Sequence, residues 1–308
     1  MEKFIKKVSI LITTKNRLLD LKYTLLKIQN LLDRGDLECI ICDDGSTDGT
    51  IAFIKENYPK ISILRNEISK GLIFSRNLLL ATTTAQYAIS LDDDAHFLTE
   101  NPLDVVQNYF QNNPNCGVLG FRIFWGVTEP AITCTNQMPS RVKGYVGCGH
   151  VWKMDAWRKV PNYPEWFVFY GEEDFAGYHS FKKNVEIHYL PSVLVHHRVD
   201  IKLRKKAIDY RLRLRRSLRS GWYLYLMFYP LKTIPRLFFY SLWMQIRNKV
   251  LKGDVMAALA IVQALGDVII HIPKLLKNSN RLQYDELKSY RKLPDTKIYW
   301  SPKDERKN

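Results

Sequence analysis

The chain lacks a cysteine framework. Its 308 residues include five cysteines, an odd number, and their spacing matches no paired metal motif. Cys39 and Cys42 form a C-x-x-C pair, but they lie inside the apolar run LECIICD, where small core residues are expected. An odd count without a disulfide pattern fits a reducing compartment, so we expect a cytoplasmic protein.

Long uninterrupted apolar segments are also missing. The N-terminal stretch MEKFIKKVSILITTKNR has only about five apolar residues in a row, too few for the hydrophobic region of a signal peptide. Residues 222–244 are broken by prolines and basic residues, and residues 255–273 contain Asp267 and His271. Neither segment offers the roughly twenty uninterrupted apolar residues of a membrane-spanning helix.

Acidic residues are scarce in the last third of the chain. Residues 1–197 hold 21 Lys/Arg against 22 Asp/Glu, whereas residues 198–308 hold 25 against 9. A basic region rich in Trp, Tyr and Phe is typical of helices that lie on an anionic membrane surface. We therefore expect peripheral association with the inner face of the cell membrane. The alternatives are a helical subdomain packed on the core and a homodimer interface.

Neither common glycine-rich phosphate loop, G-x-G-x-x-G or G-x-x-x-x-G-K-[ST], is present. A bound nucleotide would therefore have to be held in another way. Asp92 and Asp94 offer one, because they lie two residues apart where an apolar strand ends. Their hard oxygens suit Mg²⁺ or Mn²⁺, which can bridge to a diphosphate. The structural alternative is a solvated turn.

Short apolar runs alternate with helical patterns through the first hundred residues. Strands are expected at 7–13, 37–43, 61–66 and 87–94, and helices at 16–32, 45–58 and 71–84. This alternation predicts an α/β fold with a mostly parallel sheet. Ligands of such sheets bind beyond the carboxyl ends of the strands. The polar clusters at 13–16, 43–46 and 92–96 should therefore face one crevice.

Residues 1–200 resemble family 2 glycosyltransferases, which have the GT-A fold. The resemblance is carried, in order, by VSILITTKNR, ECIICDDGSTDGT, RNEISKGLIFSRN, AISLDDDAHF, VGCGHVWKMDAWRKV, FVFYGEEDF and YLPSVLVHH. It implies a GT-A domain over 1–200, followed by a basic helical region over 201–308. It also implies inverting transfer of a sugar from a nucleotide-diphosphate sugar to a glycan or lipid-linked acceptor, with Mg²⁺ or Mn²⁺ as cofactor. Cell-surface polysaccharide or lipopolysaccharide synthesis is the expected context.

The resemblance also assigns roles to individual residues. Those implied to bind the nucleotide-sugar are Thr13, Asp43, Asp44, Arg76, Asp92 and Asp93. The implied metal ligands are Asp94 and a histidine of VLVHH. Strand alternation sets His197 on one face with Val195 and His196 on the other, and His197 is the preferred ligand.

The motif GEEDF implies the catalytic pair, with Asp174 as general base and Glu173 as its partner. A sugar hydroxyl is a poor nucleophile until a carboxylate takes its proton, so the reaction needs such a group. The alternative is that these acids simply stabilise a helix N-terminus.

Two other classes of function compete with this hypothesis. A nucleotidyltransferase acting on sugar phosphates also uses acids and a metal, but it usually needs a phosphate loop that ILITTKNRLLD lacks. A non-catalytic protein that binds anionic surfaces or nucleic acid would use the basic last third. There the aromatics alternate with Leu, Ile and Met rather than Gly and polar residues, so no nucleic acid partner is expected.

Overall fold

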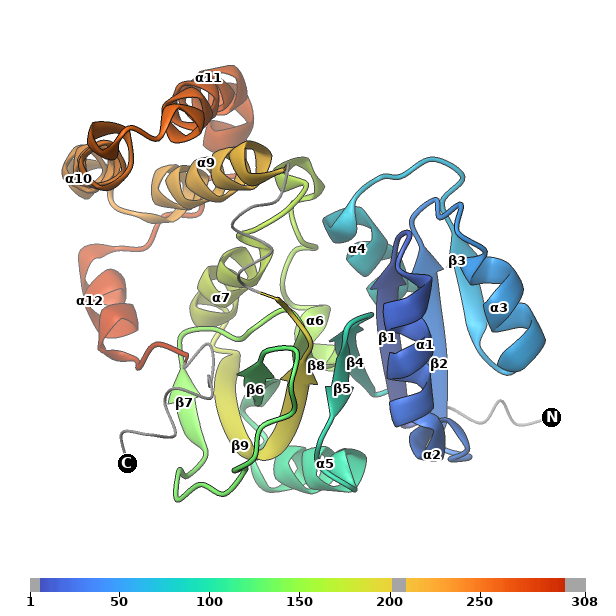
Figure 1. The fold of residues 1–308 in the computed structure, drawn as a ribbon. Coiled ribbons are helices and arrows are strands. Elements are labelled where there is room, and N and C mark those ends of the chain that lie inside the picture. Colours follow the sequence, from blue (N-terminus) through green and yellow to red (C-terminus); the bar gives the residue numbers. More distant parts are fainter. Residues whose placement is uncertain (1–5, 201–208, 297–308) are drawn as a thin grey trace.

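The computed structural model describes residues 6–200 and 209–296. The N-terminal half is a run of strand–helix units (Figure 1). Its strands are β1 (Val8–Thr14), β2 (Leu37–Asp43), β3 (Ser62–Arg65) and β4 (Tyr87–Asp92). Its helices are α1 (Leu18–Lys27), α2 (Gln29–Leu32), α3 (Thr50–Asn57) and α4 (Leu72–Thr82). All four strands are parallel, so their carboxyl ends meet at one edge of the sheet.

The second half completes a nine-stranded mixed sheet in the order β3-β2-β1-β4-β8-β6-β9-β5, with β7 paired to β9. Its strands are β5 (Ala95–Phe97), β6 (Cys116–Trp125), β7 (Ser140–Val142), β8 (Gly149–Lys153) and β9 (Glu186–His197). Between them lie α5 (Pro102–Asn112), α6 (Met154–Trp157), the 3₁₀ helix η1 (Glu165–Phe167) and α7 (Glu172–Lys182). β8 runs antiparallel to β4 and β6, which ends the parallel part of the sheet.

Alternating residues of the buried strands feed two hydrophobic clusters. On β1, Ile10 and Ile12 belong to the cluster that includes α1 and α5, whereas Leu11 belongs to the other, which includes α4 and α7. Because successive side chains of a strand point to opposite faces, the sheet is covered on both sides. This is why its central strands read as continuous apolar runs.

The predicted elements of the first hundred residues are confirmed, with differences at their ends. The helix expected over 45–58 begins only at Thr50, because Gly45 and Gly49 take positive φ angles of 80° and 86° in the preceding loop. The helix expected over 16–32 is interrupted at Ile28 and forms α1 and α2. The sheet is parallel as predicted up to β4 and mixed beyond it.

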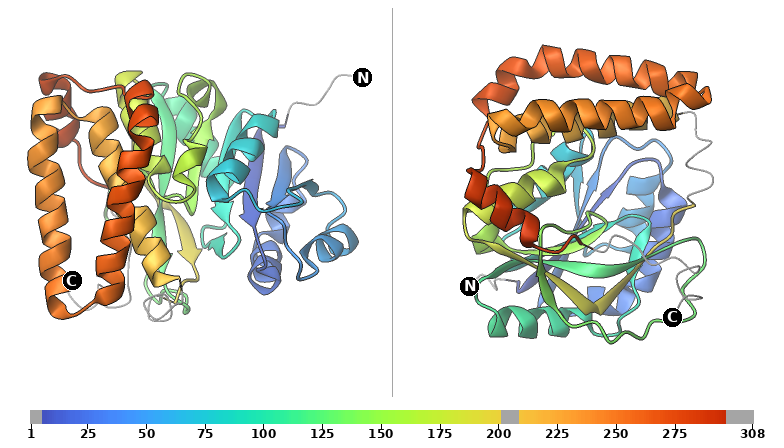
Figure 2. Two further views of the ribbon diagram at one scale, coloured as in Figure 1. Left: turned by 90° about the horizontal axis from the view of Figure 1, so that it is seen from above. Right: turned by 90° about the vertical axis from the view of Figure 1, so that its left-hand side faces the viewer.

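The C-terminal region is helical and packs on the sheet domain (Figures 1 and 2). It contains α9 (Tyr210–Phe228), η2 (Leu231–Thr233), α10 (Ile234–Asn248), η3 (Val250–Lys252), α11 (Val255–Lys277) and α12 (Tyr284–Lys292). Trp222 and Phe228 of α9 are fully buried in the same cluster as Phe175 of α7. The two regions therefore share one hydrophobic core, while a domain boundary at residue 200 stays a sequence-based prediction.

Candidate active site

The carboxyl ends of the parallel strands line a cavity of about 490 Å³, here called the strand-end cavity. Each of the three polar clusters contributes to it, through Thr13, Asp44 and the run Asp92 to Asp94. The prediction that these clusters face one crevice is confirmed.

A second cavity of about 620 Å³, here called the α7 cavity, meets the first. Both are lined by Asp92, His197 and Arg213. Glu173 and Asp174, from the first turn of α7, line only the second. Two adjoining cavities that share Asp92 and His197 as lining residues can hold two substrates with their reacting groups close together.

Asp43 and Asp44 hold the loops at the mouth of the strand-end cavity. The Asp44 carboxylate accepts hydrogen bonds from Ser69 Oγ at 2.6 Å, Lys70 N at 2.8 Å and Gly71 N at 3.0 Å. Burial acts in the opposite direction, but these donors lower the pKa of Asp44. Asp43 is fully buried and accepts from Ser46 N at 3.3 Å. Of the two, only Asp44 lines the cavity.

Of the three consecutive aspartates, Asp93 and Asp94 share Arg17 as a partner, and their other contacts differ. Asp93 accepts a hydrogen bond from Thr14 Oγ1 at 2.8 Å and pairs with Arg17 at 3.2 Å. Burial, only partly offset by Arg17, raises the pKa of Asp93 to about 8. Asp94 pairs with Arg17 through one oxygen, at 2.7 Å, and lies 3.0 Å from His197 Nε2 through the other. Arg17 beside Asp93 and Asp94, and Arg76 beside Asp92, thus offset part of the repulsion among the three.

Asp92, Asp94 and His197 could hold a metal ion. Their ligand atoms lie within 4.8 Å of one another. Asp94 Oδ1 is buried, lies 3.0 Å from His197 Nε2 and has no other close partner within the described parts of the chain. Two carboxylates and one imidazole fit Mn²⁺, since Mg²⁺ strongly prefers oxygen ligands. The donor set therefore fits the predicted cofactor.

His196 points to the other face of β9. Its Nε2 bonds to the carbonyl oxygen of Gly126 at 2.7 Å, and its ring packs against His96. His96, His196 and Glu129 also lie close enough to form a metal group. However, Arg198 donates to His96 Nδ1 at 2.7 Å, which leaves the proton on Nε2, facing Glu129. A protonated Nε2 of His96 cannot bind a metal, so the His96, His196 and Glu129 group is a poor metal site. Of the two histidines of β9, His197 is therefore favoured as the metal ligand, because it lies with Asp92 and Asp94.

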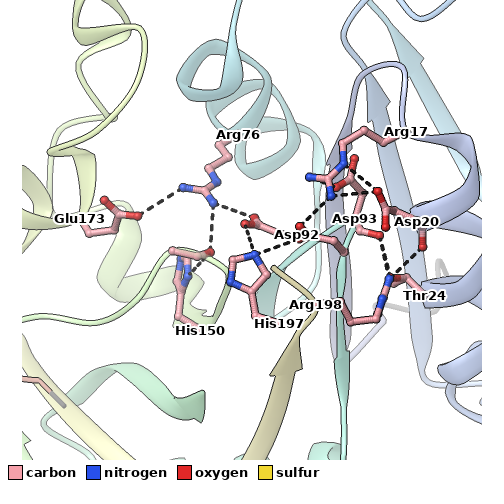
Figure 3. A network of polar contacts seen from close by, with 12 residues as sticks. Arg17, Asp20, Thr24, Arg76, Asp92, Asp93, His150, Glu173, His197 and Arg198 are labelled. Carbon is pink, nitrogen blue, oxygen red and sulfur yellow. Dashed lines mark hydrogen bonds and ion pairs between the residues drawn. The ribbon is translucent and has the colours of Figure 1, made fainter. Parts of the chain in front are cut away.

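Arg76 of α4 lines the α7 cavity and joins Asp92 to the acids of α7 (Figure 3). Arg76 is only 5% exposed. Its guanidinium pairs with Asp92 at 2.9 Å, Glu172 at 2.8 Å and Glu173 at 3.5 Å. A β-carbon at Gly147 would lie 2.0 Å from Glu173 Oε1 and 2.8 Å from Arg76 Nη1. Only glycine therefore allows this approach, which leaves Glu173 beside Arg76, the residue that also pairs with Asp92.

Asp174 lies on a different side of the α7 turn. Among the described residues Arg76 pairs with Asp92, Glu172 and Glu173 but not with Asp174, whose electrostatic neighbours are Glu173 and Asp295. Solvent reaches it from the α7 cavity. Desolvation by the surrounding protein, with these two acids, raises the pKa of Asp174 to about 6. Of the two predicted catalytic acids, Glu173 is the one joined to Asp92 through Arg76.

Sequence reasoning missed three arginines in the strand-end cavity. Arg17 follows the β1 motif, and Arg213 and Arg216 come from α9. The basic run RLRLRRSLR was assigned as a whole to an anionic surface. No spacing signal distinguishes the arginines that face the cavity from those that face solvent, because the orientation of α9 is set by its packing on the sheet domain. Among the aromatic residues near α7, Tyr170 lines the α7 cavity, whereas Trp152 and Trp157 are core residues.

Comparison with known proteins agrees with this geometry. The glycosyl transferase family 2 model matches residues 9–178, more than half of the chain. The putative glycosyltransferase EpsE of Bacillus subtilis is 28% identical over 163 residues, covering 46% of this chain and 58% of that protein. An uncharacterized glycosyltransferase of Haemophilus influenzae is 30% identical over 108 residues, 35% of this chain and 36% of that protein. The chain thus matches little more than half of the length of one relative and about a third of the other.

Solved structures with similar folds include a mannosyltransferase and a protein solved with UDP. The mannosyltransferase PcManGT from Pyrobaculum calidifontis, solved with GDP-Man and Mn²⁺, has a TM-score of 0.52 and 13% identity, covering 92% of this chain and 78% of its own. TarS of S. aureus, solved with UDP, has a TM-score of 0.56 and 15% identity, covering 89% and 83%. These likenesses confirm the predicted GT-A fold. The family model, which matches more than half of the chain, establishes that the chain belongs to glycosyl transferase family 2.

Proposed function

We propose that this protein transfers a sugar from a nucleotide-diphosphate sugar to an acceptor hydroxyl. The observation that carries the proposal is the junction of the two cavities at Asp92 and His197. The strand-end cavity would hold the donor, and the α7 cavity would hold the acceptor. The loop between Thr13 and Arg17 would lie against the nucleotide.

We propose Glu173 as the group that takes the proton of the attacking hydroxyl. It lines the acceptor side, and Arg76 holds it next to the wall shared with the donor side. The sequence favoured Asp174, which stays the alternative base. Arg76 acts as a positioning residue, because it joins Asp92 on one side to Glu172 and Glu173 on the other.

We propose that Asp94 and His197, with Asp92, hold Mn²⁺ or Mg²⁺. A divalent ion there would neutralise the charge that grows on the leaving diphosphate. Arg17, already 2.7 Å from Asp94, can add a hydrogen-bond donor on the same side.

We propose a single displacement that inverts the anomeric carbon. The base on α7 and the leaving group in the strand-end cavity would act from opposite sides of the sugar, which suits in-line attack. The anomeric configuration of the product, read by NMR, tests this, since a retained configuration would contradict it.

We propose a glycan or lipid-linked acceptor, used in cell-surface polysaccharide synthesis at the inner face of the membrane. Tyr170, Tyr229 and Tyr290 line the α7 cavity, and aromatic faces of this kind can pack on sugar rings. Tyr229 and Tyr290 come from the basic C-terminal region. The acceptor side is thus built partly from the region that suits an anionic surface.

The central experiment is a donor screen. Thermal shifts with UDP-, GDP- and dTDP-sugars, with Mn²⁺ or Mg²⁺, should identify one stabilising donor. Incubation with acceptor should then release the nucleoside diphosphate. Release of pyrophosphate would support a nucleotidyltransferase instead, and no stabilisation by any nucleotide would support a non-catalytic protein.

Arg216→Gln should weaken binding of the donor's nucleoside diphosphate by about tenfold or more, because a charge-assisted contact is lost. Arg216 lines the strand-end cavity, and within the described residues it has no carboxylate partner. Isothermal titration at two salt concentrations should also show a weaker salt dependence. Arg211→Gln, an exposed position on the same helix outside the cavity, is the control. Equal affinities for the two variants would remove Arg216 from the donor site.

A further inference from the structure

α10, η3 and α11 carry many exposed large apolar side chains, here called the α10–α11 face. The two helices run side by side along the outer edge of the molecule (Figure 2). Large apolar side chains exposed there are Phe239, Tyr240, Trp243, Leu251, Val255, Met256, Leu259, Val262, Ile269, Ile270, Ile272 and Leu276. Ile270 is 72% exposed and Phe239 is 65% exposed. Exposed large apolar side chains gathered on neighbouring helices indicate an interaction site.

The charges around this face are of one sign. Residues 231–278 contain seven lysines and arginines and only two acids, Asp254 and Asp267. Asp254 caps α11 at Ala257 N and accepts a hydrogen bond from Tyr210, and Asp267 pairs with Arg215 at 2.5 Å. Neither acid is exposed. The exposed charges beside the apolar side chains are therefore basic, namely Lys232, Arg236, Arg247, Lys252, Lys274 and Lys277.

A second copy of the chain is a poor occupant for this face. In a symmetric dimer the same surface would meet itself, and the basic side chains of one copy would face those of the other. An anionic lipid surface offers complementary charge for the lysines and arginines and an apolar interior for the isoleucines and aromatics. Charge complementarity thus selects the lipid.

α11 is long and apolar enough, by length and composition, to cross a membrane, although the sequence argument had excluded this segment. Buried core helices pass the same test. Here α11 packs on α9, and Ala257, Ala260 and Ala264 on one side of α11 are fully buried. Asp267 also ties this side to Arg215 and Arg219 of α9. A helix held along one side by the protein can offer only its opposite side to lipid.

We propose that the α10–α11 face docks on an anionic phospholipid bilayer, with both helices lying in the plane of the membrane surface. Apolar side chains of the face enter the boundary between headgroups and acyl chains, while the lysines and arginines contact lipid phosphates. The α10–α11 face would then be the surface responsible for the membrane association proposed above. Vesicle binding tests this without any transfer activity.

The test is sedimentation of the full chain with vesicles. Binding is expected to vesicles of phosphatidylcholine mixed with phosphatidylglycerol, to weaken as salt rises, and to be much lower with phosphatidylcholine alone. The double variant Ile269→Gln/Ile270→Gln should bind at least about tenfold more weakly, since two apolar side chains no longer enter the bilayer. Arg236→Gln/Arg247→Gln should weaken binding to a similar extent, only on anionic vesicles.

The matched control is Ile132→Gln/Met138→Gln, two exposed apolar residues in the loop between β6 and β7. It should bind vesicles like the parent chain. Equal binding of the control and the Ile269/Ile270 variant would overturn the proposal. So would resistance to alkaline carbonate extraction, which indicates a spanning helix, or dissociation of a dimer by the Ile269/Ile270 variant without loss of vesicle binding. Loss of transfer with vesicle binding intact would contradict the proposed function alone.

Discussion

Glu173→Gln is expected to reduce sugar transfer by about a thousandfold and to leave binding of the donor nucleotide unchanged. The amide keeps the size of the side chain but cannot accept a proton from the acceptor hydroxyl. Glu173 lies 3.5 Å from Arg76 and lines the acceptor side only, so the donor side should be unaffected. Single-turnover transfer and isothermal titration of the nucleotide measure the two effects separately.

Asp174→Asn is the matched control, because it makes the same change one residue later in the same helical turn. We expect a loss smaller than about tenfold, since Asp174 lies outside the Arg76 network. If the two variants exchange these effects, Asp174 is the base. Transfer by the parent chain would then fall as the pH drops through about 6, where the Asp174 carboxylate becomes protonated. Full transfer by both variants would contradict a base on α7.

Asp94→Asn is expected to abolish the support that Mn²⁺ gives to nucleotide binding, lowering the affinity at least about a hundredfold. The change removes a charge from the buried oxygen that faces His197 at 3.0 Å. Titration of the nucleoside diphosphate with and without Mn²⁺ measures this support directly. With a chelator present, the parent chain should bind the nucleoside diphosphate as weakly as the variant does. The affinity of the variant should change little.

Asp93→Asn is the control for the metal experiment. Asp93 is adjacent in sequence and equally buried, but it turns toward Thr14 and Arg17 rather than His197. An amide can still accept the hydrogen bond from Thr14, so the dependence on Mn²⁺ should persist. If Asp94→Asn retains that dependence, or Asp93→Asn loses it in the same degree, the proposed ligand set is wrong. His197→Gln should resemble Asp94→Asn, and His196→Gln should not.

Much of the fold could be predicted because its signals are local. The apolar runs of β1, β2 and β4 are buried on both faces, and nothing but a covered sheet accommodates them. The C-terminal helices were harder to place. α9 is strongly basic, yet Trp222, Tyr223 and Phe228 are buried against the sheet domain, and two of its arginines line the strand-end cavity. Charge composition describes a helix as a whole and does not say which side meets the protein.

The sequence by itself determined the family, the parallel half of the sheet and the set of acids at its edge. Strand ends and ordered motifs are properties of short stretches, and parallel strands bring their carboxyl ends to one edge. Tertiary packing decided the rest. It brought His197 to Asp94 across a hundred residues, and it turned Glu173 rather than Asp174 toward Arg76. It also left the basic, apolar side of α10 and α11 facing outward. Successive side chains of a helix point about 100° apart, so which of them reaches a site depends on how the whole helix is packed.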